Sequence, residues 1–103
     1  MDKWSVYTAK VYFEDAVEQY KIRPIIALGD RGLYCDSLKI TSQQKNDWRH
    51  VELTQWRAAG LDKPSWVDVS KVLKVPDNLI IEKIGTLDVE DIQMIMRAMN
   101  RIG

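Results

Sequence analysis

Short segments of β-prone residues, separated by turn signals, fill most of this chain, and only its C-terminal end carries a long helical pattern. Residues 4–13 are rich in aromatic and β-branched side chains, which favour a pleated sheet over a helix. Residues 29–32 read Gly-Asp-Arg-Gly, which suits a hairpin turn. This spacing has no βαβ rhythm and predicts a small barrel. The expected strands are 4–13, 25–28, 33–40, 50–53, 65–75 with a bend near Lys71, and 79–84.

The remaining segments are expected to be two helices and two polar loops, the loops at 14–18 and 41–47. Thr54 can cap a brief helix that runs to Ala59 and ends at Gly60. Asp88 can cap a longer C-terminal helix. The fold class is therefore expected to be mostly β with short helices, a small barrel closed by an amphipathic C-terminal helix. The predicted buried face of that helix consists of Val89, Ile92, Ile95, Met96 and Met99.

Length and composition limit the class of protein. The 103 residues suffice for one hydrophobic core, so a single domain spanning 1–103 is expected. Fifteen basic residues balance fifteen acidic ones, so a polyanion would have to be bound by a local patch. Cys35 is the only cysteine, which excludes an intrachain disulfide and indicates a reducing compartment. A cytoplasmic location without a membrane span is expected, because there is no signal pattern and no apolar run of about 18 residues.

Few residues of this sequence suit metal or nucleotide chemistry. The chain lacks a glycine-rich phosphate loop and has one histidine and one cysteine, so neither a nucleotide-binding site nor a zinc centre is expected. His50 could act as a general acid or base near neutral pH. Its position beside Val51 favours the interpretation that His50 is an ordinary strand residue without a catalytic role.

A basic cluster surrounds the expected loop at 41–47. Lys39, Lys45 and Arg49 give this loop a local positive charge, which predicts attraction for phosphate groups. Trp48 could stack on an unpaired base, or it could pack into the core. The cluster is the most basic feature of an otherwise neutral chain.

The order of motifs along the chain is more informative than any single residue. Glu18-Gln19 is followed after three residues by Arg23-Pro24, then by an aliphatic strand and by Thr41 at the end of the next expected strand. In this order the chain resembles the MazF/PemK toxin family. The resemblance covers roughly the whole chain, because its C-terminal half also matches through Gly60-Leu61, Ser65 and the stretch 83–87 before an acid-led helix.

The resemblance implies an SH3-like barrel that forms a homodimer, cleaves single-stranded RNA in the cytoplasm without a metal ion or cofactor, and is inhibited by a cognate antitoxin. RNA supplies its own nucleophile, the 2′-OH, so the protein has to provide positioning, proton transfer and charge stabilisation. At the matching positions, Arg23 would stabilise the pentavalent phosphorane, Thr41 would orient the phosphate or the 2′-OH, and Glu18 would take the 2′-OH proton. Further RNA contacts are expected from Gln19, Lys21, Lys39, Ser42, Lys45, Trp48, Arg49 and Lys71.

Two departures from the family pattern leave a second interpretation open. The common Gly-Asp opening of the first strand is missing, and Leu73 stands where a basic residue is expected. In a regular strand Lys71 would point the same way as Leu73, whereas Lys74 would point the opposite way. The alternative function is therefore a non-catalytic SH3-like barrel that binds a peptide or RNA.

Overall fold

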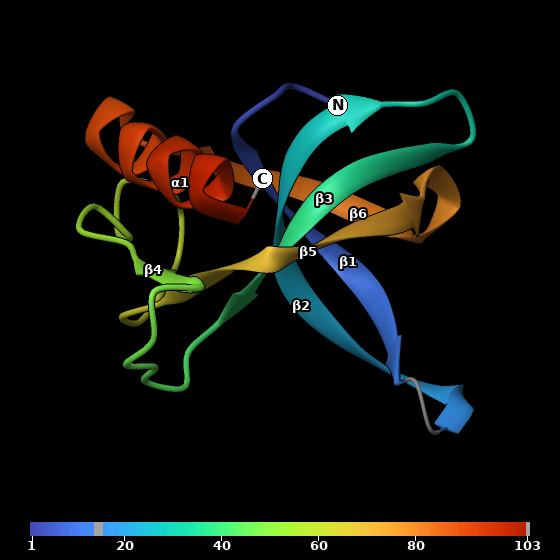
Figure 1. Cartoon of the computed structure of the whole chain (residues 1–103). Coiled ribbons are helices and arrows are strands. Elements are labelled where there is room, and N and C mark those ends of the chain that lie inside the picture. Colours follow the sequence, from blue (N-terminus) through green and yellow to red (C-terminus); the bar gives the residue numbers. More distant parts are fainter. Residues whose placement is uncertain (14–15, 103) are drawn as a thin grey trace.

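The computed structural model describes residues 1–13 and 16–102, which form one antiparallel sheet of six strands and one α-helix (Figure 1). The strand order across the sheet is β4-β5-β3-β2-β1-β6. In chain order, the elements are β1 (Ser5–Phe13), β2 (Ala16–Asp30), β3 (Tyr34–Thr41), β4 (His50–Glu52), β5 (Trp66–Pro76), a 3-10 turn η1 (Asp77–Leu79), β6 (Ile80–Thr86) and α1 (Val89–Ile102).

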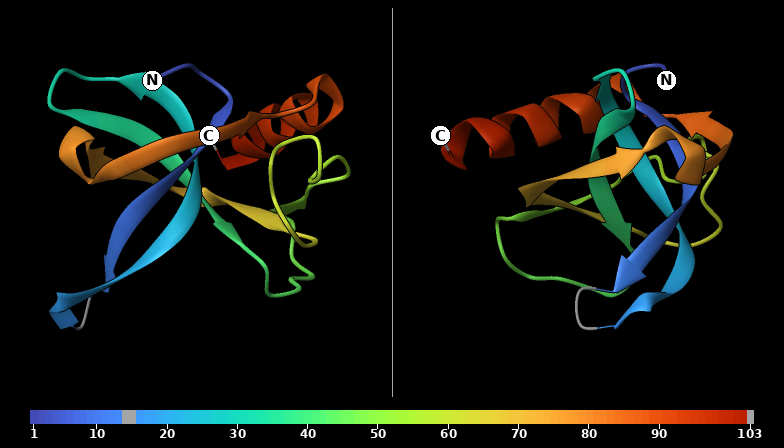
Figure 2. Two further views of the ribbon diagram at one scale, coloured as in Figure 1. Left: turned by 180° about the vertical axis from the view of Figure 1, so that it is seen from behind. Right: turned by 90° about the vertical axis from the view of Figure 1, so that its right-hand side faces the viewer.

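The predicted fold class is confirmed in its main features, a mostly β chain with a C-terminal helix. Closure of the barrel is not confirmed, because β4 and β6 are the two edges of the sheet and do not pair in the part of the chain that the structure describes. α1 packs over β4 and β5. The β1–β2 hairpin projects at the opposite end of the molecule (Figure 2).

β2 is much longer than the aliphatic run that predicts it. The strand begins at Ala16, so the expected loop is wrong for residues 16–18, while residues 14 and 15 lie outside the described ones. β2 pairs with β1 over most of its length, and Tyr12 still faces Tyr20. This pairing satisfies backbone hydrogen-bonding groups and so keeps the polar stretch 18–23 extended without an apolar side-chain pattern.

Both faces of the sheet bury apolar side chains, since successive residues of a strand point to opposite sides. Ile26 belongs to a cluster with Leu38 that Ile95 of α1 completes. Its neighbour Ile25 belongs to a second cluster with Tyr7. The short aliphatic run predicted as a buried strand therefore contributes to two cores.

The C-terminal helix begins as predicted. The backbone N–H of Glu90 donates a hydrogen bond of 3.0 Å to a carboxylate oxygen of Asp88, which is the expected cap. Three of the residues predicted for the buried face do pack against the core, namely Ile92, Ile95 and Met99. The start of the helix and most of its apolar contacts were thus correctly predicted.

The other two residues assigned to that face are exposed. Val89 is 66% exposed and Met96 is 49% exposed. Asp91 and Ala98 are buried instead. The face that meets β4 and β5 follows the line of Asp91, Ile95 and Ala98, which are spaced four and three residues apart.

Residues 54–60 form turns rather than the predicted short helix. The predicted cap residue, Thr54, donates hydrogen bonds from its backbone N–H and its hydroxyl to Oδ1 of Asp91, at 2.9 and 2.8 Å. The backbone N–H of Gln55 donates to Oδ2 of Asp91 at 3.0 Å. A carboxylate of α1 therefore holds the start of this turn segment.

Two glycines allow this turn segment to lie directly on β6. A Cβ atom at Gly60 would overlap the carbonyl group of Ile84, and one at Gly85 would overlap the carbonyl group of Ala59. Gly60 also has a φ of 86°, which favours glycine. The predicted helix terminator thus ends a turn and permits a contact between two backbones.

Replacing Asp91 by alanine should lower the free energy of unfolding by about 3 kcal/mol, because the donors of Thr54 and Gln55 would lose a buried acceptor. Urea denaturation measures the change. Glu90→Ala, at the neighbouring exposed position, is the matched control and should change stability by less than about 0.5 kcal/mol. Equal losses in the two variants would show that these hydrogen bonds do not stabilise the fold.

Candidate functional site

Arg23 lies where β2 still pairs with β1 but its pairing with β3 has ended. It is opposite Ala9 in β1, whereas the β2–β3 ladder stops at Ile25 opposite Lys39. Continuing that register by two residues would bring Thr41, the last residue of β3, opposite Arg23. Opposed residues of an antiparallel pair have Cβ atoms about 5 Å apart. The pairing ends two residues before this position, however, so the register does not place the Arg23 and Thr41 side chains in contact.

A cavity of about 280 Å³, here called the β5 cavity, opens beside Arg23. Its charged lining consists of the cations Arg23, Lys39 and Lys71 and the carboxylate of Asp68, so it attracts anions. Leu73 lines the same cavity as Lys71, as the alternation of strand side chains predicts. Val11 and Tyr12 complete the lining.

A second cavity, of about 300 Å³ and here called the loop cavity, opens beside Arg23 toward residues 61–65. Its cations are Lys21, Arg23 and Lys63, and its carboxylate is Asp62. Arg23 is the residue that the linings of the two cavities share. The remaining lining residues are Ile22, Pro24, Ile40, Ser42, Leu61 and Ser65.

Neither Glu18 nor Gln19 lines a cavity with Arg23. Both are exposed residues of β2, and Glu18 precedes Arg23 by five positions. The register with β1 shifts between Tyr20 and Ala16, so the alternation of a regular strand does not apply across them. The structure thus places Arg23 in the linings of both cavities, but it places neither Thr41 nor Glu18 there.

The residues of the basic cluster around the loop after β3 do not lie together in the structure. Lys45 is half-buried in the loop that follows β3. Arg49 lies with its guanidinium carbon 5.7 Å from the ring centre of Trp48, and Arg101 of α1 lies 4.6 Å from the same ring. Trp48 therefore contacts the helix, in a region separate from the two cavities that share Arg23.

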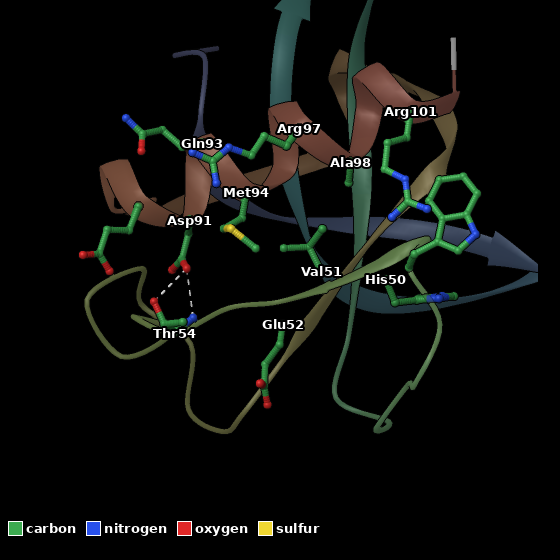
Figure 3. Close-up of a pocket in the computed structure, with 12 residues that line it drawn as sticks. His50, Val51, Glu52, Thr54, Asp91, Gln93, Met94, Arg97, Ala98 and Arg101 are labelled. Atoms are coloured by element: carbon green, nitrogen blue, oxygen red, sulfur yellow. Dashed lines mark hydrogen bonds between the residues drawn. The ribbon is translucent and has the colours of Figure 1, made fainter.

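Trp48 lines a groove of about 660 Å³ between β4 and α1, here called the helix groove. Met94 of α1 and Val51 of β4 face each other across its apolar floor, and Arg97 and Arg101 lie along the helix side (Figure 3). Figure 3 also shows Asp91 reaching Thr54 at the other end of the groove.

His50 is held by two carboxylates. Its Nδ1 lies 2.7 Å from Asp47, and its Nε2 lies 3.9 Å from Asp68. The hydrogen bond to His50 holds the pKa of the Asp47 carboxyl below its usual range. Lys39, Asp68 and His50 are opposite one another on three adjacent strands, so they share one face of the sheet. The expected strand position of His50 is confirmed. The two carboxylates near its ring were not indicated by its neighbours in the sequence.

Asp68 and Lys63 are the site residues that the sequence analysis missed. Asp68 enters the β5 cavity because β5 pairs with β3 at Lys39, a long-range register that no local pattern specifies. Lys63 enters the loop cavity because residues 61–65 pass next to β2. An offset of three would put Asp68 and Lys71 on opposite faces of a regular strand, but the irregular pairing of β5 between Asp68 and Leu73 lets both line one cavity.

Two further findings concern the described residues only. Among them, no group of three or more histidine, cysteine, aspartate or glutamate side chains is placed so that it could hold a metal ion. Within residues 1–13 and 16–102, no helix has the length and apolar character needed to cross a membrane.

The fold is shared with solved structures of low sequence identity. A Mycobacterium tuberculosis toxin, MazF-mt6, superposes with a TM-score of 0.77 at 18% identity, over 95% of this chain and 94% of that one. MazE-MazF from Deinococcus radiodurans gives 0.76 at 14% identity, over 99% and 94%. A mycobacterial endoribonuclease in complex with its cognate antitoxin gives 0.74 at 10% identity, over 97% and 91%. No curated protein matches the sequence.

An antiparallel sheet with one C-terminal helix, and with this topology, is thus the fold of small MazF-like toxins. The family model for the "PemK-like, MazF-like toxin of type II toxin-antitoxin system" matches residues 2–103. This chain therefore belongs to the PemK/MazF family of type II toxins.

Proposed function

We propose that this chain is a cytoplasmic endoribonuclease toxin that cleaves single-stranded RNA without a metal ion, through attack by the 2′-OH. The products are a 2′,3′-cyclic phosphate and a 5′-hydroxyl. The position of Arg23 supports this proposal most directly, because it lines two cation-rich cavities at once. A chain with no net charge thus concentrates positive charge at one place.

Arg23 and Thr41 have complementary roles in the proposed reaction. The Arg23 guanidinium keeps its charge and binds the phosphate oxygens where negative charge develops, and each such donor contributes about 3 kcal/mol. The Thr41 hydroxyl oxygen accepts a hydrogen bond of 3.2 Å from the backbone N–H of Gln43. The Thr41 proton is therefore directed elsewhere and can be donated to a phosphate oxygen or to the 2′-OH.

Two carboxylates are candidates for accepting the 2′-OH proton. Glu18 is proposed from the family resemblance, but it lines neither of the cavities that Arg23 lines. Asp68 lines the β5 cavity together with Arg23. We therefore propose Asp68 as the second candidate. Substitution of each carboxylate tests which of the two accepts the proton.

The remaining proposed substrate contacts fall into two groups. Lys39 and Lys71 in the β5 cavity, and Lys21 and Ser42 in the loop cavity, are placed to hold RNA next to Arg23. The residues farther away are proposed to contact more distant parts of the RNA, and they are Gln19, Lys45, Trp48 and Arg49.

We also propose a homodimer and a cognate antitoxin as partners. The similar structures include an endoribonuclease bound to its cognate antitoxin and a MazE-MazF pair. The helix groove has an apolar floor, and Met94 beside it is 48% exposed, so this side of the chain has surface to bury on another protein.

The second candidate function is a non-catalytic SH3-like barrel that binds RNA or a peptide. The observation in its favour is Leu73, which makes part of the β5 cavity apolar where the family pattern has a basic residue. The two candidates differ in whether bound RNA is cut.

Arg23→Ala should lower the rate of RNA cleavage by about 100-fold or more, because it removes a donor to the transition state. RNA affinity should fall far less, since the lysines of both cavities remain. Gel analysis of cleavage and fluorescence anisotropy measure the two effects. Arg31→Ala, in the β2–β3 turn, is the control. A variant that cuts at the wild-type rate would remove Arg23 from the active site.

A single 2′-deoxy sugar immediately 5′ of the scissile phosphate should stop cleavage there, because the nucleophile is missing. Binding should change little, and a chelator should not affect the all-RNA control. Mapping of product ends checks both points. Continued cutting at the deoxy position, or loss of activity in chelator, would contradict the proposed chemistry.

Asp68→Asn should slow cleavage by about 100-fold if Asp68 is the proton acceptor, and Glu18→Gln should then slow it by less than about tenfold. Single-turnover rates across a range of pH measure this, because loss of the base also removes its limb of the pH profile. The reverse order of effects would assign the role to Glu18.

Light scattering at micromolar concentration should give twice the mass of the 12.0 kDa chain. Met94→Glu places a charge beside the apolar floor of the helix groove and should shift the mass toward the monomer if this side is the interface. Glu82→Lys, an exposed residue of β6, serves as the control. A monomeric wild-type protein would reject the homodimer.

A further inference from the structure

The linings of the two cavities belong to different faces of the sheet. In the β5 cavity, Val11 and Leu73 pack against the cluster that contains Ile25. In the loop cavity, Ile40 belongs to the other cluster, and Leu61 packs against it. A molecule that occupies both cavities therefore has to pass from one face to the other.

The sheet has an opening at the level of Arg23. Pairing between β2 and β3 ends at Ile25 and Lys39, although β2 extends back to Ala16 and β3 continues to Thr41. Arg23 lies just beyond the last pair, and both cavities reach it. The two strands separate here, and Arg23 is at the point of separation.

The charges of the two cavities suit a chain of phosphates. Apart from Arg23, the β5 cavity offers Lys39 and Lys71 against Asp68, and the loop cavity offers Lys21 and Lys63 against Asp62. Each cavity thus has an excess of one cation before Arg23 is counted. Apolar wall residues in each, such as Leu73 and Ile22, can contact the face of a base.

We propose that a single RNA strand crosses the sheet at Arg23, where β2 and β3 no longer pair, so that the phosphate on one side of the Arg23-bound phosphate lies in the β5 cavity and the phosphate on its other side lies in the loop cavity. This inference rests on the proposed function for the identity of the ligand. Lys71 and Lys63 contact phosphates on opposite sides of Arg23. In the β5 cavity, Lys39 and Lys71 supply the cationic contact that Leu73 cannot make.

The test uses binding, so it does not depend on cleavage. The probe is the hexanucleotide that binds most tightly from a randomised 2′-O-methyl RNA pool, which cannot be cut by 2′-OH attack. A neutral methylphosphonate replaces one phosphate at a time, and each probe is titrated against wild type, Arg23→Ala, Lys71→Ala, Lys63→Ala and the control Lys74→Ala. Lys74 is an exposed residue of β5 that lines neither cavity.

Each lysine should be coupled to one phosphate. Replacing that phosphate by a methylphosphonate lowers the RNA affinity of the wild type, and this loss of affinity should be at least about twofold smaller in the lysine variant. The phosphate coupled to Arg23 should lie between the phosphates coupled to Lys71 and Lys63. Lys71→Ala and Lys63→Ala should each reduce the slope of log affinity against log salt by about 0.7, as expected for one contact to a single strand. Lys74→Ala should show neither effect.

Coupling of Lys71 and Lys63 to the same side of the Arg23 phosphate, or no coupling for either lysine, would overturn the proposed path. Failure of every hexanucleotide to bind would also overturn it. Ordered coupling without cleavage of the corresponding all-RNA hexanucleotide would keep the path and reject the endoribonuclease. Cleavage of that hexanucleotide without ordered coupling would reject the proposed path and leave the proposed endoribonuclease activity standing.

Discussion

The buried carboxylate of Asp91 connects the helix to the rest of the molecule. It is fully buried and accepts three hydrogen bonds, two from Thr54 and one from Gln55. An ionised group at such a place is stable only when donors surround it. These bonds fix the start of the 54–60 turns, and the chain that leaves those turns forms the wall of the loop cavity. The position of a helix is thereby linked to the surroundings of Arg23.

The second constraint is the unequal pairing of β2. One side of this strand is paired with β1 as far as Tyr20, whereas the other side loses β3 after Ile25. A strand held on one side only remains extended while it exposes its free edge. This is how a polar segment stays extended next to two cavities, without an apolar pattern of its own. The geometry around Arg23 comes from backbone pairing more than from local side-chain packing.

The sequence correctly predicts those structural features that depend on local residue patterns. The strands around residues 4–13 and 33–40, the irregular strand after Ser65 and the Asp88 cap are all observed. The hairpin turn predicted at 29–32 lies at 31–33, because Gly29 and Asp30 still pair with β3. The errors have a common physical origin, since partners distant in sequence decided them. Thr54 is hydrogen-bonded to Asp91 of α1, β2 extends along β1 as far back as Ala16, and the packing direction of α1 leaves Met96 exposed. For the candidate site, the order of motifs predicted Arg23 and Thr41, whereas Asp68 became a candidate only through the β3–β5 register.

The contact between Gly60 and Gly85 limits how this sequence can change over time. The similar structures share only 10 to 18% of their residues with this chain, so the fold accepts replacement at most positions. In the core, substitution of one residue by a larger one can be offset by substitution of a neighbour by a smaller one. At these two glycines any Cβ would meet a carbonyl group of the backbone, which no substitution can make smaller. A larger residue at either glycine therefore cannot be accommodated by a smaller neighbouring side chain.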